Sequence, residues 1–326
     1  MSSAAANYLS ADAIVRPTTI IEATRLDSYL GRLGHLGVKI VLASETFQQT
    51  GSFKFRAAYN VVINVPQTLF ITASSGNFGQ ALAYACALTG KSCIVVMPST
   101  SSQIKIAAVR AYGGRVELID TRMITRKKRV RQLADENPDA YLATPFDDPL
   151  VIEGNSGLGS EIAALNRGIQ EVVAPLGGGG LASGLIVGLR RAGSAIPVVA
   201  AEPLLANDGA RSLREGRIVA NEYESETIAD GARTLSVGVH NWKILQHGLE
   251  GIIEVAEDKI AEALRLLFVH ANLKVEPTAA LSLGAVLTAP EKFKDKTVCC
   301  VVSGGNVDPS TYAKLLVAQP QPARTP

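Results

Sequence analysis

Short apolar runs bounded by turn residues recur throughout the chain. They are VKIVLASE (38–45), TLFITASS (68–75), SCIVVMP (92–98), RVELID (115–120), EVVAPLGGG (171–179), PVVAAEP (197–203) and TVCCVVSGG (297–305). Their length and their flanking glycine, serine or proline residues predict buried β-strands.

Alanine-rich stretches with helical spacing lie between several of these strands. FGQALAYACALTG (78–90), QIKIAAVRAYG (103–113) and LASGLIVGLRRAG (181–193) each end in a glycine suited to a helix C-terminus. Alternating strands and helices predict parallel sheets in an α/β fold. Such sheets bind ligands beyond the carboxyl ends of their strands, where the glycine and serine clusters of this sequence fall.

Composition favours a small-molecule ligand. A chain of 326 residues with 47% hydrophobic residues is large enough for one big or two coupled domains. Its 32 lysines and arginines nearly balance its 30 aspartates and glutamates, so no overall field would attract nucleic acid or an anionic membrane. The basic run RKKRVR (126–131) is therefore interpreted as a solvated helix face.

Four cysteines without a CxxC pair or zinc-ligand spacing favour a reducing compartment. Cys299 and Cys300 are adjacent on an expected strand, so their side chains should enter opposite faces and not bridge. The N-terminus lacks a leader pattern and no apolar stretch has membrane length. We expect a soluble, cytoplasmic protein with a flexible tail over residues 319–326.

Four consecutive glycines in PLGGGGLASGL form the strongest local signal: Gly177, Gly178, Gly179 and Gly180. They lie between an expected strand and an expected helix, where backbone amides can approach an anion closely. The spacing matches neither a P-loop nor a dinucleotide-binding turn. A phosphate site is the functional interpretation and a tight turn the structural alternative.

Two further polar loops follow expected strands. One contains Ser74, Ser75, Gly76 and Asn77, and either caps a helix or binds a carboxylate. The other places Ser303 at the end of the last strand. Three loops of one type at strand ends predict a single site.

Lys54 in QTGSFKFRAAYN is the candidate nucleophile. Its neighbours Phe53 and Phe55 provide apolar surroundings that lower the pKa of an amine, although an ordinary surface lysine is the alternative. A lysine together with a phosphate cradle is what pyridoxal phosphate requires.

These features together resemble the fold-type II pyridoxal-phosphate enzymes, in particular threonine or serine dehydratases and serine racemase. The resemblance covers nearly the full length and rests on an ordered set of motifs. They are SFKFR, SSGNFGQ, GGGGL, AAEPLLANDGA, TIADGA, VEPTAALSLGA and VVSGGN.

The resemblance implies a cofactor-binding role for each residue of the set. Lys54 would form the Schiff base and later move the α proton, and Phe53 would pack on the pyridine ring. Asn77 would bond the phenolic oxygen, while Ser303 would meet the pyridine nitrogen. The phosphate would bind Gly177, Gly178, Gly179, Gly180 and the amide of Leu181.

The reaction implied is β-elimination of water from a hydroxy amino acid such as threonine or serine, giving a 2-oxo acid and ammonia. Ser74, Ser75 and Gly76 would bind the substrate carboxylate. In serine racemases the serine that matches Ser75 acts on the opposite face of the α carbon, which makes racemisation the first alternative.

A cation site and an electrostatic residue also follow from the resemblance. Glu202, the backbone oxygen of Ala206 and Asp208 would supply oxygen ligands to magnesium or calcium. Glu276 in VEPTAAL would support the cofactor pocket electrostatically.

The sequence departs from the family at Phe78, where dehydratases and racemases usually have histidine. An apolar ring beside the substrate loop could admit a bulkier substrate such as phenylserine. Arg233 could instead pair with a second carboxylate, as hydroxyaspartate requires, although a surface arginine is the alternative.

The architecture implied is two doubly wound domains of the tryptophan synthase β-subunit-like kind. We expect a small α/β domain over residues 69–147 inserted into a large cofactor-binding domain over residues 1–68 and 148–318. The resemblance also implies a homodimer without a C-terminal regulatory domain. Two other classes of protein are possible. One is a nucleotide-binding dehydrogenase, in which Glu202 would be the acidic residue at the end of the strand after the glycines; the other is a noncatalytic cofactor-binding protein.

Overall fold

The larger of two β-sheets contains strands from both ends of the chain. The structure is a computed structural model that describes residues 11–34, 37–74, 76–101 and 103–317. In spatial order this sheet contains β1 (Thr19–Glu22), β2 (Lys39–Ser44), β10 (Thr297–Val302), β7 (Glu171–Pro175), β8 (Val198–Pro203) and β9 (Leu249–Val255). Among these described strands only β1 is antiparallel to its neighbour, so the predicted α/β fold with parallel sheets is confirmed.

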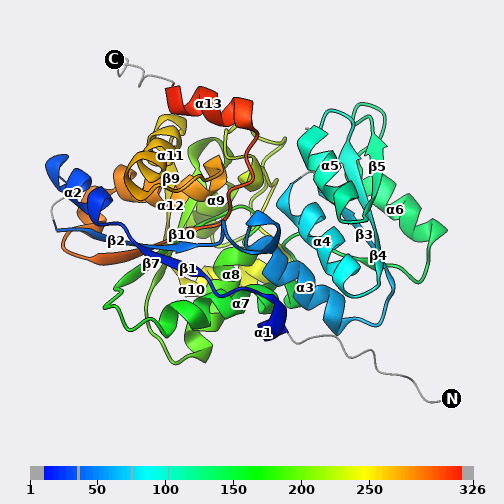
Figure 1. Cartoon of the computed structure of the whole chain (residues 1–326), viewed down its shortest axis with the longest axis horizontal. Coiled ribbons are helices and arrows are strands. Elements are labelled where there is room, and N and C mark those ends of the chain that lie inside the picture. Colours follow the sequence, from blue (N-terminus) through cyan, green and yellow to red (C-terminus); the bar gives the residue numbers. More distant parts are fainter. Residues whose placement is uncertain (1–10, 35–36, 75, 102, 318–326) are drawn as a thin grey trace.

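The second sheet is smaller and entirely parallel. Its order is β5 (Arg115–Ile119), β4 (Ser92–Pro98), β3 (Leu69–Ala73) and β6 (Tyr141–Leu142). Figure 1 shows these strands and their helices beside the part of the molecule that contains the larger sheet. All four strands lie within residues 69–147; the domain boundary itself stays a prediction.

Helices cover both faces of each sheet. One face of the larger sheet packs against α2 (Thr24–Arg32), α11 (Glu257–Ala271), α12 (Pro277–Thr288) and α13 (Pro309–Val317). The other face packs against α7 (Pro149–Ala163), α8 (Gly180–Arg191) and α10 (Val239–Gly248). The smaller sheet lies between α6 (Arg126–Glu136) and a group formed by α3 (Lys54–Asn64), α4 (Asn77–Leu88) and α5 (Gln103–Ala111).

The remaining helices are short. They are α1 (Ala11–Ile14) and α9 (Asp208–Glu215), with the 3₁₀ turns η1 (Gln49–Gly51), η2 (Leu204–Ala206), η3 (Asp230–Ala232) and η4 (Pro290–Phe293). Within the described residues, no helix has the length and apolar character needed to cross a membrane.

Strand β10 illustrates how the sequence pattern determines the core. Cys299 packs with the residues on one face of the sheet and Cys300 with those on the other, and both are free thiols. This agrees with the alternation of side chains along a strand. The expectation that the two cysteines fill the core without bridging is confirmed.

Candidate active site

A cavity of about 530 Å³ lies where the carboxyl ends of β3, β7 and β10 meet the first turns of α3, α4 and α8. It brings together nearly all residues predicted to bind cofactor or substrate. The predicted residues that line it are Phe53, Lys54, Ser74, Gly76, Asn77, Phe78, Gly177, Gly178, Gly179, Gly180, Leu181, Glu276 and Ser303. Ser75 lies outside the described residues.

Lys54 is the first residue of α3, and its amine enters this cavity. Its Nζ donates a hydrogen bond of 2.6 Å to the carbonyl oxygen of Pro145 and lies 4.9 Å from the centre of the Phe53 ring. Burial lowers the pKa of Lys54 to about 8, although the Glu276 carboxylate acts to raise it. A lower pKa increases the fraction of neutral, nucleophilic amine near neutral pH.

The glycine loop connects β7 to α8 and can be formed only by small residues. Gly179 has φ of 96°, which glycine adopts without strain. A Cβ atom on Gly178 would lie 2.3 Å from the Phe146 ring. The first amides of α8 have no acceptor within the helix, so the loop presents donors to an anion.

Ser303 follows β10 and is almost fully buried. Its hydroxyl has no hydrogen-bond partner among the described residues, although it faces the cavity. Its carbonyl oxygen accepts the N–H of Phe53 at 3.0 Å, which ties the start of α3 to the end of β10. A buried hydroxyl without a hydrogen-bond partner is costly, and at the edge of a cavity it indicates a polar ligand atom.

Asn77 and Glu276 are hydrogen-bonded to each other in the wall of the cavity. The amide nitrogen of Asn77 donates to both carboxylate oxygens of Glu276, at 2.9 and 3.0 Å, and its oxygen accepts from Asn306. Burial raises the pKa of Glu276 to about 7, helped by the charge of Asp230 and opposed by the bond from Asn77. The amide is thus held in one orientation toward the site.

The loop after β3 supplies both a helix cap and part of the cavity wall. The Ser74 hydroxyl oxygen accepts the N–H of Gly79 at 3.0 Å and so satisfies a free amide of the first turn of α4, as the capping interpretation expects, although Gly76 occupies the N-cap position. Within the described residues the Ser74 hydroxyl only accepts hydrogen bonds, so its hydrogen can donate to a ligand. Phe78 is buried in α4, and its ring centre lies 5.9 Å from the Lys54 amine.

Two ion pairs in the cavity wall were not predicted from the sequence. Lys105 of α5 pairs with Asp230 at 2.6 Å, and Arg126 of α6 forms an ion pair with Glu224. Arg126 begins the basic run interpreted above as a solvated helix face, which holds for the exposed Lys127 and Lys128.

Arg233 also lines the cavity. Its Nε and Nη2 atoms donate to the carbonyl oxygen of Thr227, at 2.9 and 2.5 Å. Among the described residues it forms no ion pair, which distinguishes it from Lys105 and Arg126.

The candidate cation ligands lie apart from the cavity lining. Glu202 is the penultimate residue of β8 and accepts the N–H groups of Gly209 and Ala210, at 2.9 and 2.8 Å. Asp208 opens α9, and its Oδ2 is buried without a hydrogen-bond partner among the described residues. Burial raises the pKa of Glu202 to about 8 and that of Asp208 to about 6.

The described residues contain no cluster of three or more histidine, cysteine, aspartate or glutamate side chains suited to a metal. A cation here would therefore need the carbonyl oxygen of Ala206 and water as further ligands. Glu202 is almost fully buried and is not part of the cavity lining at the glycine loop, so it is not placed to bind the ribose of a dinucleotide held there.

The chain is similar in sequence to racemases and dehydratases. Mouse serine racemase (Mus musculus) is 34% identical over 304 residues, covering 89% of this chain and 86% of that protein. The β-hydroxyaspartate dehydratase of Paracoccus denitrificans is 33% identical over 306 residues, covering 93% and 96%. Both similarities extend over nearly the whole chain.

A solved structure and a family model agree with this likeness. The crystal structure of a threonine deaminase from T.th. superposes with a TM-score of 0.83 at 38% identity, covering 91% of this chain and 95% of that one. The model of the family described as "Pyridoxal-phosphate dependent enzyme" matches residues 12–304. The chain therefore belongs to the family of pyridoxal-phosphate dependent enzymes.

Proposed function

We propose that this protein eliminates water from a small hydroxy amino acid such as serine or threonine, giving a 2-oxo acid and ammonia. One observation carries the proposal: the Lys54 amine enters the same cavity as the glycine loop and the unpaired hydroxyl of Ser303. An amine, an anion cradle and a neutral hydroxyl are the partners that pyridoxal phosphate needs.

The cavity fits this cofactor at three places. Lys54 would hold it through Nζ, the loop of Gly177–Gly180 would hold its phosphate, and Ser303 Oγ would gain the polar partner that it lacks among the described residues. The bound cofactor supplies an electron sink that makes the α proton of an amino acid acidic. A neutral serine beside the ring nitrogen suits elimination better than chemistry that needs a strong electron sink.

The chain's own residues would then bind the substrate and move its protons. Lys54, with its lowered pKa, can take the α proton at Nζ. Ser74 and Gly76 would offer a hydroxyl and an amide to the substrate carboxylate, since the Gly76 N–H makes only a long bond of 3.4 Å to Ser74 Oγ. The ion pairs Lys105–Asp230 and Arg126–Glu224 line the same cavity and place charged groups beside the substrate.

A substrate screen tests the proposal. Purified protein loaded with pyridoxal phosphate is mixed with L-threonine, L-serine, D-serine, threo-3-hydroxyaspartate or phenylserine, and 2-oxo acid and substrate chirality are followed together. Release of 2-oxo acid from serine or threonine is expected. Inversion without 2-oxo acid would instead establish a racemase, the activity named for the mouse relative.

Hydroxyaspartate is a second candidate substrate, favoured by Arg233. This cation lines the cavity and binds only a backbone carbonyl among the described residues, so it can bind a second carboxylate. Two relatives are named for dehydration or deamination of hydroxyaspartate. Arg233→Gln should then lower turnover of hydroxyaspartate and leave that of serine unchanged.

Three further features expected from the sequence are also proposals. Magnesium or calcium would bind Glu202, Ala206 and Asp208, as tested below. Light scattering on the purified protein would test the homodimer, and fractionation of the source cells the cytoplasmic location.

A further inference from the structure

The first turn of α3 carries a second cation, Arg56, on the side away from the cavity. Residues two positions apart on a helix point about 200° apart. Lys54 lines the cavity, whereas Arg56 lies in the protein interior with 2% of its side chain exposed. The same helical turn therefore presents the reactive amine on one side and a buried guanidinium on the other.

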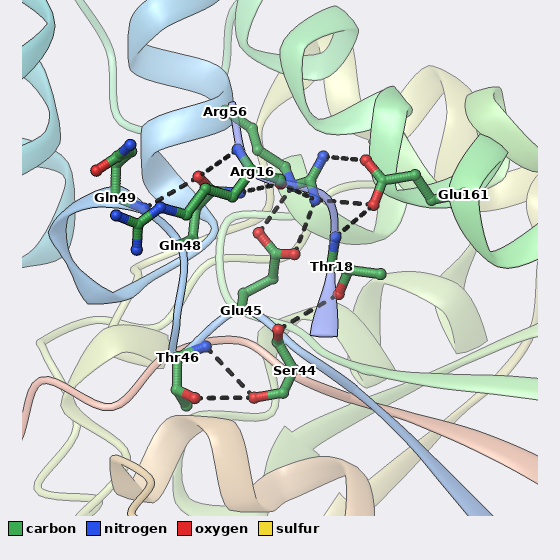
Figure 2. A network of polar contacts seen from close by, with 9 residues as sticks. All are labelled: Arg16, Thr18, Ser44, Glu45, Thr46, Gln48, Gln49, Arg56 and Glu161. Carbon is green, nitrogen blue, oxygen red and sulfur yellow. Dashed lines mark hydrogen bonds and ion pairs between the residues drawn. The ribbon is translucent and has the colours of Figure 1, made fainter. Parts of the chain in front are cut away.

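The Arg56 guanidinium binds two carboxylates at once (Figure 2). Its Nε and Nη2 atoms donate to Glu45, at 2.7 and 2.9 Å. Its Nη1 and Nη2 atoms donate to Glu161, at 2.6 and 3.1 Å. Paired bonds of this kind fix both the position and the plane of the guanidinium.

Glu45 connects this cluster to the strand ends that form the site. It follows β2, is fully buried, and donates its N–H to the carbonyl oxygen of Val302 at 2.9 Å. Val302 directly precedes Ser303, whose hydroxyl faces the cavity. Arg56 is thereby held against the edge of the sheet that presents Ser303.

Glu161 connects the cluster to α7, the helix that follows the partner of Lys54. Pro145, which accepts the Lys54 bond, lies four residues before the start of α7. The two helices are in direct contact, because a Cβ atom on Gly154 would lie 2.6 Å from the Arg56 carbonyl oxygen. Glu161 also accepts the N–H of Thr18 at 2.6 Å.

Such a cluster is not explained by stability alone. Its side chains expose 2%, 0% and 31% of their surface for Arg56, Glu45 and Glu161. Removing charges from water costs about as much as their attraction returns, and well-packed apolar residues are often equally stable. Fixing one arrangement of neighbouring segments is the best-supported use of buried ion pairs.

We propose that Arg56 is a positioning residue: through Glu45 and Glu161 it fixes the first turn of α3 between β2 and α7 and so aims the Lys54 amine at the cofactor. This inference rests on the proposed function, in which Lys54 holds pyridoxal phosphate. It concerns the geometry of attachment and not the choice of substrate.

Arg56→Lys is the decisive variant, because it keeps the positive charge and removes the forked bonds. A displaced reacting group can lose up to about 100-fold in rate, so we expect kcat to fall at least about tenfold and KM to change less than about threefold. The dissociation constant of pyridoxal phosphate should also rise about tenfold, read from the visible absorbance during titration.

Arg191→Lys is the matched control. Arg191 makes the same forked pair with Glu153 on α7, at 2.8 and 2.6 Å, but both side chains are about half exposed. It should leave kcat and the cofactor dissociation constant unchanged. A lower melting temperature of Arg56→Lys with unchanged kcat and cofactor affinity would show a structural role only and overturn the proposal.

Glu161→Gln provides the test if Arg56→Lys does not fold, since Glu161 is partly exposed and glutamine retains one acceptor. It should raise the cofactor dissociation constant at least about threefold, and no change would overturn the proposal. Failure of the proposed function can be told apart from failure of this inference. If the proposed function is wrong, the wild-type protein itself will not attach pyridoxal phosphate or eliminate water.

Discussion

Lys54 and Arg56 lie two residues apart in one helical turn, yet the polar groups around them differ in pairing. Arg56 binds two carboxylates and the carbonyl oxygen of Arg16, all at hydrogen-bonding distance. Lys54 donates to a backbone carbonyl and shares its cavity with a serine hydroxyl that is unpaired among the described residues. A fully paired cluster fixes the geometry of its side chains, whereas a buried hydroxyl without a partner beside a cavity indicates a ligand site.

The largest effect should come from removing the Lys54 amine from the cavity. Lys54→Ala leaves no amine to hold the cofactor, so turnover should fall more than about 1,000-fold and the visible absorbance of attached cofactor should disappear. Absorbance spectra and 2-oxo acid release measure both effects. Retention of both would refute the role of Lys54 and, with it, the proposed function.

The glycine loop should be the next most sensitive part of the cavity. In Gly178→Ala the new Cβ would lie 2.3 Å from the Phe146 ring, which should cost about 1–3 kcal/mol in the free energy of unfolding. Cofactor affinity should fall as well, because the loop must move.

Gly31→Ala is the matched control for that substitution. It lies on α2 with no atom within 4 Å of the added Cβ, and alanine is the better helix former by about 1 kcal/mol. Chemical unfolding of both variants gives the comparison. Equal stability of the two would contradict the close packing of the loop.

Glu276 tests how burial and charge combine in the cavity. Its pKa is raised to about 7, so between about pH 4.5 and 7 the folded protein holds a proton that the unfolded chain releases. The free energy of unfolding should therefore fall, by about 3 kcal/mol at most, as pH rises through that window. Glu276→Gln should show a flatter stability profile in unfolding experiments between pH 5 and 8, and a profile parallel to wild type would contradict the raised pKa.

The strand-end loops could be predicted because their signals are local. Gly177–Gly180, Ser74 and Ser303 each follow an apolar run directly, and parallel strands bring such loops to one edge. Lys54 was found by its aromatic neighbours, and its lowered pKa agrees with that argument.

The charged partners could not be predicted because they are distant in sequence. Lys105 and Asp230 are 125 residues apart, and Arg56 and Glu161 are 105 apart. Pro145 follows a strand of only two residues, too short to give a strand pattern. Arg56 is the last residue of the SFKFR motif, but no feature of the neighbouring sequence distinguishes a buried arginine from an exposed one.

The smallest effect concerns Glu202 and Asp208, which lie outside the cavity. Asp208, like Ser303, has a buried oxygen atom without a hydrogen-bond partner among the described residues, its Oδ2, whereas both Glu202 oxygens accept helix amides.

Magnesium or calcium binding here would stabilise the folded protein by about 2.7 kcal/mol at 100 times its dissociation constant. A chelator should then lower the melting temperature by a few degrees and added magnesium should restore it. Asp208→Asn keeps an acceptor for Asn221 but removes the charge, so its melting temperature should not respond to chelator or metal. If the wild-type protein were equally indifferent, Asp208 would be a buried acid without a cation, and its unpaired oxygen would need another partner.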